Sequence, residues 1–189
     1  MTKTFKIKDL GDLRYFLGFD VARSKKWIMM NQRKYALELL TYTCLLAYKP
    51  AVTPMDNLVK FSSTRSVSFT DVHAYRRLIG RLMYLTNARS DITFFVNQLS
   101  QFLDKPTIAH YNAAIRILKY IKGVLNLGLF FFSNSFVHLK TFCDSDWSTC
   151  SDSRQSMTDF SVYLGNSLYT GNQRSKKQYQ RVPVKLNTG

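Results

Sequence analysis

The run from Tyr75 to Gly123 constrains the fold of this chain most strongly, because it contains three segments with helical periodicity. In each segment, apolar residues recur at intervals of three and four, which places their side chains on one face of an α-helix. Three such helices with short connections must bury their apolar faces against one another or against a sheet. The predicted faces are Tyr75, Leu78, Ile79, Leu82 and Leu85; then Ile92, Phe95, Val96, Leu99 and Leu103; then Tyr111, Ala114, Ile115, Leu118 and Ile121.

The third segment also carries signals for both of its ends. Thr107 is the predicted N-cap, because a threonine hydroxyl can accept a hydrogen bond from a free amide of the first turn. Gly123 is the predicted residue just after the helix, where a left-handed conformation favours glycine. His110 lies close to the helix start, and we expect it to have a structural role there.

Ahead of these helices the sequence predicts a β-hairpin followed by a helix. Leu13–Val21 is rich in aromatic residues, and Trp27–Met30 is a second apolar run after the basic turn Arg23–Lys26. Gly18 interrupts the first strand, where a glycine usually marks a bulge or a close backbone approach. Asn31–Leu46 is the predicted helix, capped by Asn31. Its predicted face is Tyr35, Leu39, Tyr42 and Leu46.

The region after the helices is predicted to form short strands. Leu127–Phe132 is an apolar run that fits an edge or return strand, and Ser133–Ser135 fits a turn. Three further strands are expected at Phe136–Phe142, Met157–Leu164 and Ser167–Gly171.

The succession of residues from Tyr75 to Gly123 resembles the connection region of the Pol polyprotein of copia-type LTR retrotransposons, which joins the reverse transcriptase to its RNase H domain. An unrelated three-helix bundle would share the helical period but not this order of residues. By the same resemblance, Tyr15–Gly18 is similar to the primer-grip hairpin, whose backbone supports the primer end, and the helix after it to the start of the thumb.

The resemblance implies an α+β fold: a β-hairpin and a helical thumb and connection region, followed by a truncated three-stranded RNase H-like sheet. The chain then divides into four parts. Residues 1–56 hold the primer-grip hairpin and the start of the thumb, and residues 57–70 form a linker rich in serine and threonine. Residues 71–132 form the helical connection region, and residues 136–189 form the truncated RNase H-like domain.

The resemblance also identifies one candidate catalytic residue, Asp144, because the first strand of the RNase H fold carries an aspartate that faces the substrate. Enzymes of that fold cleave the RNA strand of a hybrid with two Mg²⁺ ions about 4 Å apart. Magnesium needs several hard oxygen ligands, and one aspartate holds it poorly. The next family ligand is a helical glutamate, whereas the single glutamate here, Glu38, lies in the thumb-like segment. We therefore expect Asp144 to be a vestigial ligand and the chain to hold no cofactor, although the intact family uses Mg²⁺.

The expected function is that of a fragment of a reverse transcriptase and RNase H polyprotein, catalytically inactive, with residual nucleic-acid binding. The family's polymerase carboxylates belong to a Tyr-Val-Asp-Asp motif upstream of the primer grip, and we expect the chain to begin after it. The alternative is an Mg²⁺-dependent ribonuclease that acts on RNA–DNA hybrids through Asp144 with improvised partners such as Asp146 or Asp152. A further aspartate, Asp159, matches no catalytic position of the family and replaces a glycine of the family pattern. A third possibility is a remnant whose incomplete sheet exposes an apolar face and aggregates.

The net charge of the chain indicates which kind of binding partner to expect. The chain has 27 Lys and Arg against 12 Asp and Glu, a formal charge of +15, which attracts polyanions and above all nucleic acid. Several of the basic residues lie off the apolar faces of the predicted helices. A solvated polar face explains any single one of them equally well. The candidate nucleic-acid-binding residues are Tyr15, Phe16, Leu17, Gly18, Arg33, Lys34, Arg77, Arg81, Arg116, Lys119, Lys176 and Lys177.

Membrane, secretory and zinc-binding roles are not expected. No apolar run approaches the ~20 residues that a bilayer-spanning helix needs, and the amino terminus lacks a signal-peptide core. The three cysteines, Cys44, Cys143 and Cys150, lack the spacing of a metal finger. We therefore expect an intracellular protein in a reducing environment. Its compartment and oligomeric state are left open.

Overall fold

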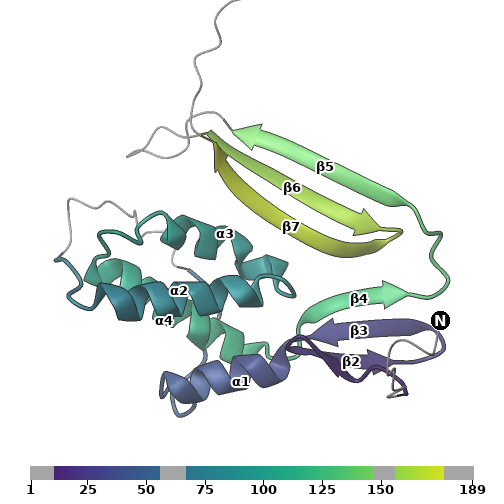
Figure 1. The fold of residues 1–189 in the computed structure, drawn as a ribbon, viewed down its shortest axis with the longest axis horizontal. Coiled ribbons are helices and arrows are strands. Elements are labelled where there is room, and N and C mark those ends of the chain that lie inside the picture. Colours follow the sequence, from purple (N-terminus) through teal and green to yellow (C-terminus); the bar gives the residue numbers. More distant parts are fainter. Residues whose placement is uncertain (1–10, 56–66, 147–155, 177–189) are drawn as a thin grey trace, which may run out of the picture.

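The computed structural model describes residues 11–55, 67–146 and 156–176, which form four helices and two antiparallel sheets (Figure 1). The chain is therefore of the α+β class. In chain order the elements are β1 (Tyr15–Phe16), β2 (Phe19–Arg23), β3 (Trp27–Asn31), α1 (Arg33–Tyr42), α2 (Val72–Leu85), α3 (Ser90–Ser100), α4 (Ile108–Gly123), β4 (Gly128–Phe132), β5 (Leu139–Asp146), β6 (Ser156–Leu164) and β7 (Ser167–Lys176).

The core is formed where the helices meet, and the predicted apolar faces supply most of it. Every residue of the predicted α2 face is buried. In α3 and α4 the centres of the faces are buried, whereas Phe95, Tyr111 and Ile115 are only partly so and Leu103 lies beyond the end of α3. The buried face of α4 includes three residues that the predicted face did not contain, namely His110, Ala113 and Ile117. Periodicity therefore identified the helices and, with a small rotation, their buried sides.

The two ends of α4 differ in how well they were predicted. Thr107 is the N-cap, and it forms a reciprocal pair with His110: the Thr107 hydroxyl accepts from the His110 amide, and His110 Nδ1 accepts from the Thr107 amide at 3.1 Å. The structural role of His110 is confirmed. The prediction for Gly123 is wrong, because Gly123 is the last helical residue and its φ is not positive. A Cβ there would lie 3.3 Å from Pro50 Cβ, so glycine permits a close approach of that segment.

The predicted bounds and face of α1 also need correction. Asn31 is the last residue of β3, and Gln32 occupies the N-cap position without a side-chain cap. The helix ends at Tyr42, since Cys44 has a φ of +56° that a continuing helix does not allow. Tyr42 and Leu46, predicted to share the apolar face, are exposed. The buried residues are Ala36, Leu39 and Leu40.

The first sheet joins segments from the two sides of the helical region. Its strand order is β1-β2-β3-β4, so the predicted hairpin is present and β4 adds to it after the chain has passed through all four helices. Gly18 does not form a bulge; it lies in the two-residue turn between β1 and β2. Gly128 permits the close β3–β4 pairing, because a Cβ there would lie 2.2 Å from the Met30 carbonyl oxygen.

The second sheet has the order β5-β6-β7, with antiparallel pairs throughout. Its three strands agree with the predicted number, but β5 begins at Leu139 and β7 continues to Lys176. A tight turn at Gly165, whose φ is +60°, joins β6 to β7. The sheet lies beside the helical cluster, with β7 near α3 and β4 (Figure 1). Whether this arrangement is that of RNase H stays a prediction.

The end of the predicted linker packs on the helical cluster. Residues 57–66 lie outside the described part of the chain, but Ser68 forms a bridge with Thr107. The Phe69 ring stacks on Tyr111, with centroids 4.4 Å apart. None of the helices that the structure describes is long and apolar enough to cross a membrane. Cys44 and Cys143 are free thiols, and Cys150 lies outside the described residues.

Candidate nucleic-acid interface

The turn at Leu17 and Gly18 is held against helix α2. Both residues have positive φ, +46° and +78°, as the two-residue turn of a tight hairpin requires. The Tyr84 hydroxyl donates a hydrogen bond to the Leu17 carbonyl oxygen. A Cβ at Gly18 would lie 2.6 Å from that hydroxyl oxygen, so glycine is needed both for the turn and for this contact. The side chains of Tyr15, Phe16 and Leu17 remain exposed around it.

A basic groove begins beside this turn. It has a volume of about 540 Å³ and is lined by Gly18, Tyr35, Arg77, Gly80, Arg81 and Tyr84. Gly80 faces open space, so the helix backbone itself is accessible from the groove. The Arg81 guanidinium lies over the Tyr42 ring, 3.9 Å from its centroid. The groove is therefore lined by two arginines and two tyrosines, a combination suited to an anion with flat apolar groups attached.

The Tyr35 phenol in the groove packs against Tyr84 and is partly buried. Tyr35 and Tyr84 meet edge to face, with ring centroids 4.8 Å apart. Burial raises the pKa of the Tyr35 phenol, and the nearby positive charge of Arg81 only partly opposes this. Glu38 is the acidic residue at the adjoining hollow, which it lines together with Tyr35, Tyr42, Leu39 and Arg81.

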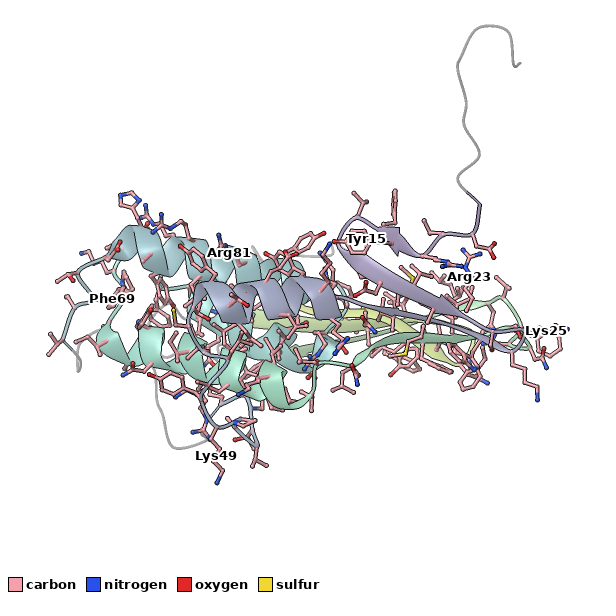
Figure 2. The ribbon with its side chains drawn as sticks, turned by 90° about the horizontal axis from the view of Figure 1, so that it is seen from below. Tyr15, Arg23, Lys25, Lys49, Phe69 and Arg81 are labelled. Carbon is pink, nitrogen blue, oxygen red and sulfur yellow. The ribbon has the colours of Figure 1, made fainter. Side chains whose placement is uncertain are left out.

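Helix α1 adds positive charge at the same side. Lys34 Nζ lies 5.0 Å from the centroid of the Tyr15 ring, and the Lys34 amide donates to the Asp20 carboxylate at 3.3 Å. Arg33 is exposed in the same helical turn. Tyr15 and Arg81 lie on the same side of the molecule (Figure 2). The structure thus brings together eight of the predicted residues: Tyr15, Phe16, Leu17, Gly18, Arg33, Lys34, Arg77 and Arg81.

The two predicted residues of α4, Arg116 and Lys119, contact a different segment. Arg116 Nη2 donates to the Thr53 hydroxyl at 3.1 Å, and Lys119 Nζ lies 4.9 Å from the Tyr48 ring centroid. Both therefore hold the segment that follows α1. Lys49 of that segment lies on the opposite side of the molecule from Arg81 (Figure 2). We exclude both residues from the basic groove, and their contact with nucleic acid stays a prediction.

The second sheet contains the remaining predicted residues. Lys176 is the last residue of β7, and Lys177 lies outside the described residues. Asp144 is in β5, and its Cα partner across the β5–β6 pair is Asp159. Helix α1, which contains Glu38, lies at the far side of the helical cluster from β5 (Figure 1). Among the side chains that the structure describes, which do not include those of Asp144 and Asp159, no group of three His, Cys, Asp or Glu residues could hold a metal ion.

A half-buried ion pair at the start of α3 was not predicted. Arg89 is 4% exposed, donates to both carboxylate oxygens of Asp91 at 2.8 Å, and donates to the Val124 carbonyl at 3.1 Å. Burial alone would raise the pKa of the Asp91 carboxyl, but the hydrogen bonds and charge of Arg89 outweigh it and leave the pKa below its ordinary value. The pair joins the start of α3 to the end of α4. The sequence contained a signal for this pair, because Asp91 lies in the first turn of a helix, two positions after Arg89.

Two further residues were missed although the sequence held a signal for one of them. Tyr84 follows Arg77 and Arg81 at seven and three residues, the spacing that places all three on one side of a helix. Tyr42 was assigned to the apolar face of α1, whereas its ring is exposed and the Arg81 guanidinium lies over it. Neither could be tied to the hairpin turn without the long-range fold.

The comparisons with known proteins give relatives for almost the whole chain. It is 37% identical to the uncharacterized mitochondrial protein AtMg00810 of Arabidopsis thaliana over 165 residues, which cover 87% of this chain and 68% of that protein. It is 36% identical to the retrovirus-related Pol polyprotein from transposon RE1 of Arabidopsis thaliana over 177 residues, 94% of this chain and 12% of that polyprotein. The Pol polyprotein from transposon TNT 1-94 of Nicotiana tabacum is 28% identical over 169 residues, 85% of this chain and 13% of its own length.

These matches cover only a small part of the Pol polyproteins, since the chain spans 12% of the length of the RE1 polyprotein. No protein-family model matches the chain. No solved structure matches it either.

Proposed function

The chain belongs to the family of retrovirus-related Pol polyproteins from transposons, and from this premise we propose that it binds nucleic acid without sequence preference through the basic groove. It corresponds in this proposal to the end of the reverse transcriptase and the beginning of RNase H in a copia-type element. Its ligand is an RNA–DNA hybrid or a primer–template duplex. The piece catalyses neither DNA synthesis nor RNA cleavage by itself.

One observation carries the proposal: the exposed hairpin turn and the two arginines of α2 border the same groove. Guanidinium groups recognise phosphate by paired hydrogen bonds, and Arg77 and Arg81 lie one helical turn apart. Gly80 leaves room for a backbone to approach closely, because nothing lies within 4 Å of the position of a Cβ there. Phosphate contacts of this kind carry no sequence information, so the binding is expected to depend on charge and shape.

The proposed lack of catalysis rests on the donor set of the described residues. Asp144 has one acidic Cα partner, Asp159, and Glu38 belongs to α1. A two-metal site requires more carboxylate oxygens than this pair supplies. We therefore derive no cleavage step for this chain.

Filter binding of a labelled RNA–DNA hybrid at increasing salt concentration tests the binding proposal. We expect binding at low salt and, for the Arg77→Gln/Arg81→Gln variant, a salt-dependence slope smaller by about 2, because two phosphate contacts are lost. The matched control is Arg23→Gln/Lys25→Gln, which removes the same charge at the far end of the first sheet (Figure 2). Absence of binding at low salt, or an equal loss in both double variants, contradicts the proposal.

A second candidate, an Mg²⁺-dependent ribonuclease, is favoured by the register that makes Asp144 and Asp159 partners. Incubation of a labelled hybrid with the protein and Mg²⁺ separates the two candidates. We expect no cleavage above background. Cleavage that disappears in both Asp144→Asn and Asp159→Asn would establish the ribonuclease, whereas cleavage that survives both would identify a contaminant.

A further inference from the structure

An apolar cleft lies on the other side of the hairpin turn from the basic groove. It has a volume of about 500 Å³, within the range typical of small-molecule sites. The buried side chain of Leu129 contributes to its lining, and Phe16 and Leu17 are the exposed residues of the turn itself. Among the lining residues Asn87 alone has a polar side chain. The full lining is Phe16, Leu17, Phe19, Met30, Asn87, Leu129 and Phe131.

The groove and the cleft are joined through one residue. Tyr84 lines the groove, and its hydroxyl donates to the carbonyl of Leu17, which lines the cleft. Asn87 lies three residues after Tyr84, and its backbone N–H donates to the Tyr84 carbonyl at 3.4 Å. A chain that passes over the Leu17–Gly18 turn therefore meets guanidinium groups on one side and an apolar cavity on the other.

We propose that the cleft accepts an unpaired nucleobase of a single strand whose phosphates lie in the basic groove. The inference rests on the proposed nucleic-acid binding and extends it: a duplex contacts the groove alone, whereas a single strand contacts the groove and the cleft together and is bound more tightly. A base has apolar faces and a polar edge, and the cleft offers the Phe16 ring for stacking and one amide for the edge. The side-chain amide of Asn87 both donates and accepts hydrogen bonds, so it can pair with the edge of more than one base.

Charge complementarity favours this occupant over an apolar peptide. Arg77 and Arg81 line the adjoining groove, and Lys34 lies over the Tyr15 ring, so the neighbourhood of the cleft attracts an anion. Asp20 and Glu38 are the acidic residues nearby, and the Asp20 carboxylate already accepts a hydrogen bond from the Lys34 amide. A base in a duplex has its edge paired and its faces stacked, and it cannot enter the cleft unless it is first extruded.

The test compares one oligonucleotide in three forms: single-stranded, duplex, and single-stranded with 2-aminopurine in its centre. Wild-type protein is expected to bind the single strand more tightly than the duplex and to quench 2-aminopurine fluorescence by stacking. Phe16→Ala is expected to weaken single-strand binding by about tenfold and duplex binding by a clearly smaller factor. The matched control is Phe132→Ala, because Phe132 is 56% exposed, against 55% for Phe16, but does not line the cleft.

Circular dichroism verifies that both variants are folded, which is expected because the substituted rings are largely exposed. Equal affinity for single strand and duplex, or equal effects of the two substitutions, overturns the inference while the proposed function stands. Unchanged 2-aminopurine fluorescence also overturns it and points to an apolar peptide as the occupant. Binding of neither nucleic acid overturns both proposals.

Discussion

The positive charges of α2 and those of α4 are equally prominent in the sequence, yet they make different contacts in the fold. Arg77 and Arg81 of α2 line an open groove, and the Arg81 guanidinium lies over the exposed Tyr42 ring. On α4, Arg116 and Lys122 donate to oxygen atoms of the segment after α1. A basic residue that donates to oxygen atoms within the fold contributes to stability, whereas one that borders a groove remains able to bind a ligand.

The largest expected effect concerns Arg89, the most deeply buried of the basic residues that serve stability. Arg89→Ala removes two hydrogen bonds to the Asp91 carboxylate, which keeps its hydrogen bond with Tyr120, and one hydrogen bond to the Val124 carbonyl. We expect the free energy of unfolding to fall by about 2 kcal/mol, because charge-assisted hydrogen bonds are lost while the Asp91 side chain, 32% exposed, can be solvated. Chemical denaturation measures this.

Arg77→Ala is the control for Arg89, because it removes an arginine from the exposed groove. We expect its free energy of unfolding to change by less than about 0.5 kcal/mol. A similar loss in the two variants would remove the distinction between structural and ligand-binding arginines.

A smaller effect is expected for Lys122, whose Nζ donates to the carbonyl oxygens of Leu46 and Tyr48 at 2.6 and 2.5 Å. Lys122→Met keeps the apolar stem and removes the donors. Because the contact is partly solvated, we expect a loss of about 1.5 kcal/mol in the free energy of unfolding, with nucleic-acid affinity unchanged beyond the loss of one charge. Lys105→Met, at an exposed lysine, should leave stability unchanged in the same denaturation experiment.

Tyr84 refines the comparison between α2 and α4, because it stabilises the fold and also lines the groove. Tyr84→Phe removes the hydrogen bond to the Leu17 carbonyl and should cost about 1 kcal/mol in the free energy of unfolding. It should also weaken nucleic-acid binding, since the turn would no longer be fixed to α2. Tyr48→Phe, on the exposed segment after α1, is the control for both measurements. Unaltered binding by Tyr84→Phe would show that the turn takes no part in the interface.

The smallest expected effect is a pH dependence from His110 at the start of α4. Burial lowers the pKa of this imidazole from its ordinary value of 6.5, and its Nδ1 accepts a hydrogen bond that protonation would abolish. The unfolded chain then binds the proton more readily. Stability is therefore full above about pH 6.5 and decreases as the pH falls toward the lowered native pKa.

Denaturation midpoints at several pH values measure this effect. His110→Gln should remove the decrease, and His73→Gln, at an exposed position of α2, should retain it. A decrease that persists in His110→Gln would assign it to another group.

The sequence predicted what depends on local pattern and missed what depends on distant pairing. The faces of α2 to α4 follow from the spacing of apolar residues, and the cap at Thr107 follows from residue type. The pairing of β3 with β4 joins segments about a hundred residues apart, and nothing local in either strand specifies it. The position of Gly18 against Tyr84 depends on that long-range arrangement, so the sequence indicated a close approach there without its partner.

The candidate site was predictable to the same extent. Residue type and charge selected Arg77, Arg81, Arg116 and Lys119 together, because all four lie off the apolar faces of their helices. Only the fold shows that Thr53 and Tyr48 meet the last two. The pairing of Asp144 with Asp159 likewise follows from a strand register that alternation alone does not determine.

The most direct test compares two double variants that remove equal charge, Arg77→Gln/Arg81→Gln and Arg116→Gln/Lys119→Gln, in hybrid binding and in chemical denaturation. We expect the α2 variant to lose about tenfold or more in affinity at low salt with its stability retained. The α4 variant should lose stability and keep most of its affinity. Equal losses of affinity in the two variants would mean that net charge alone governs binding, and would contradict the division between the two helices.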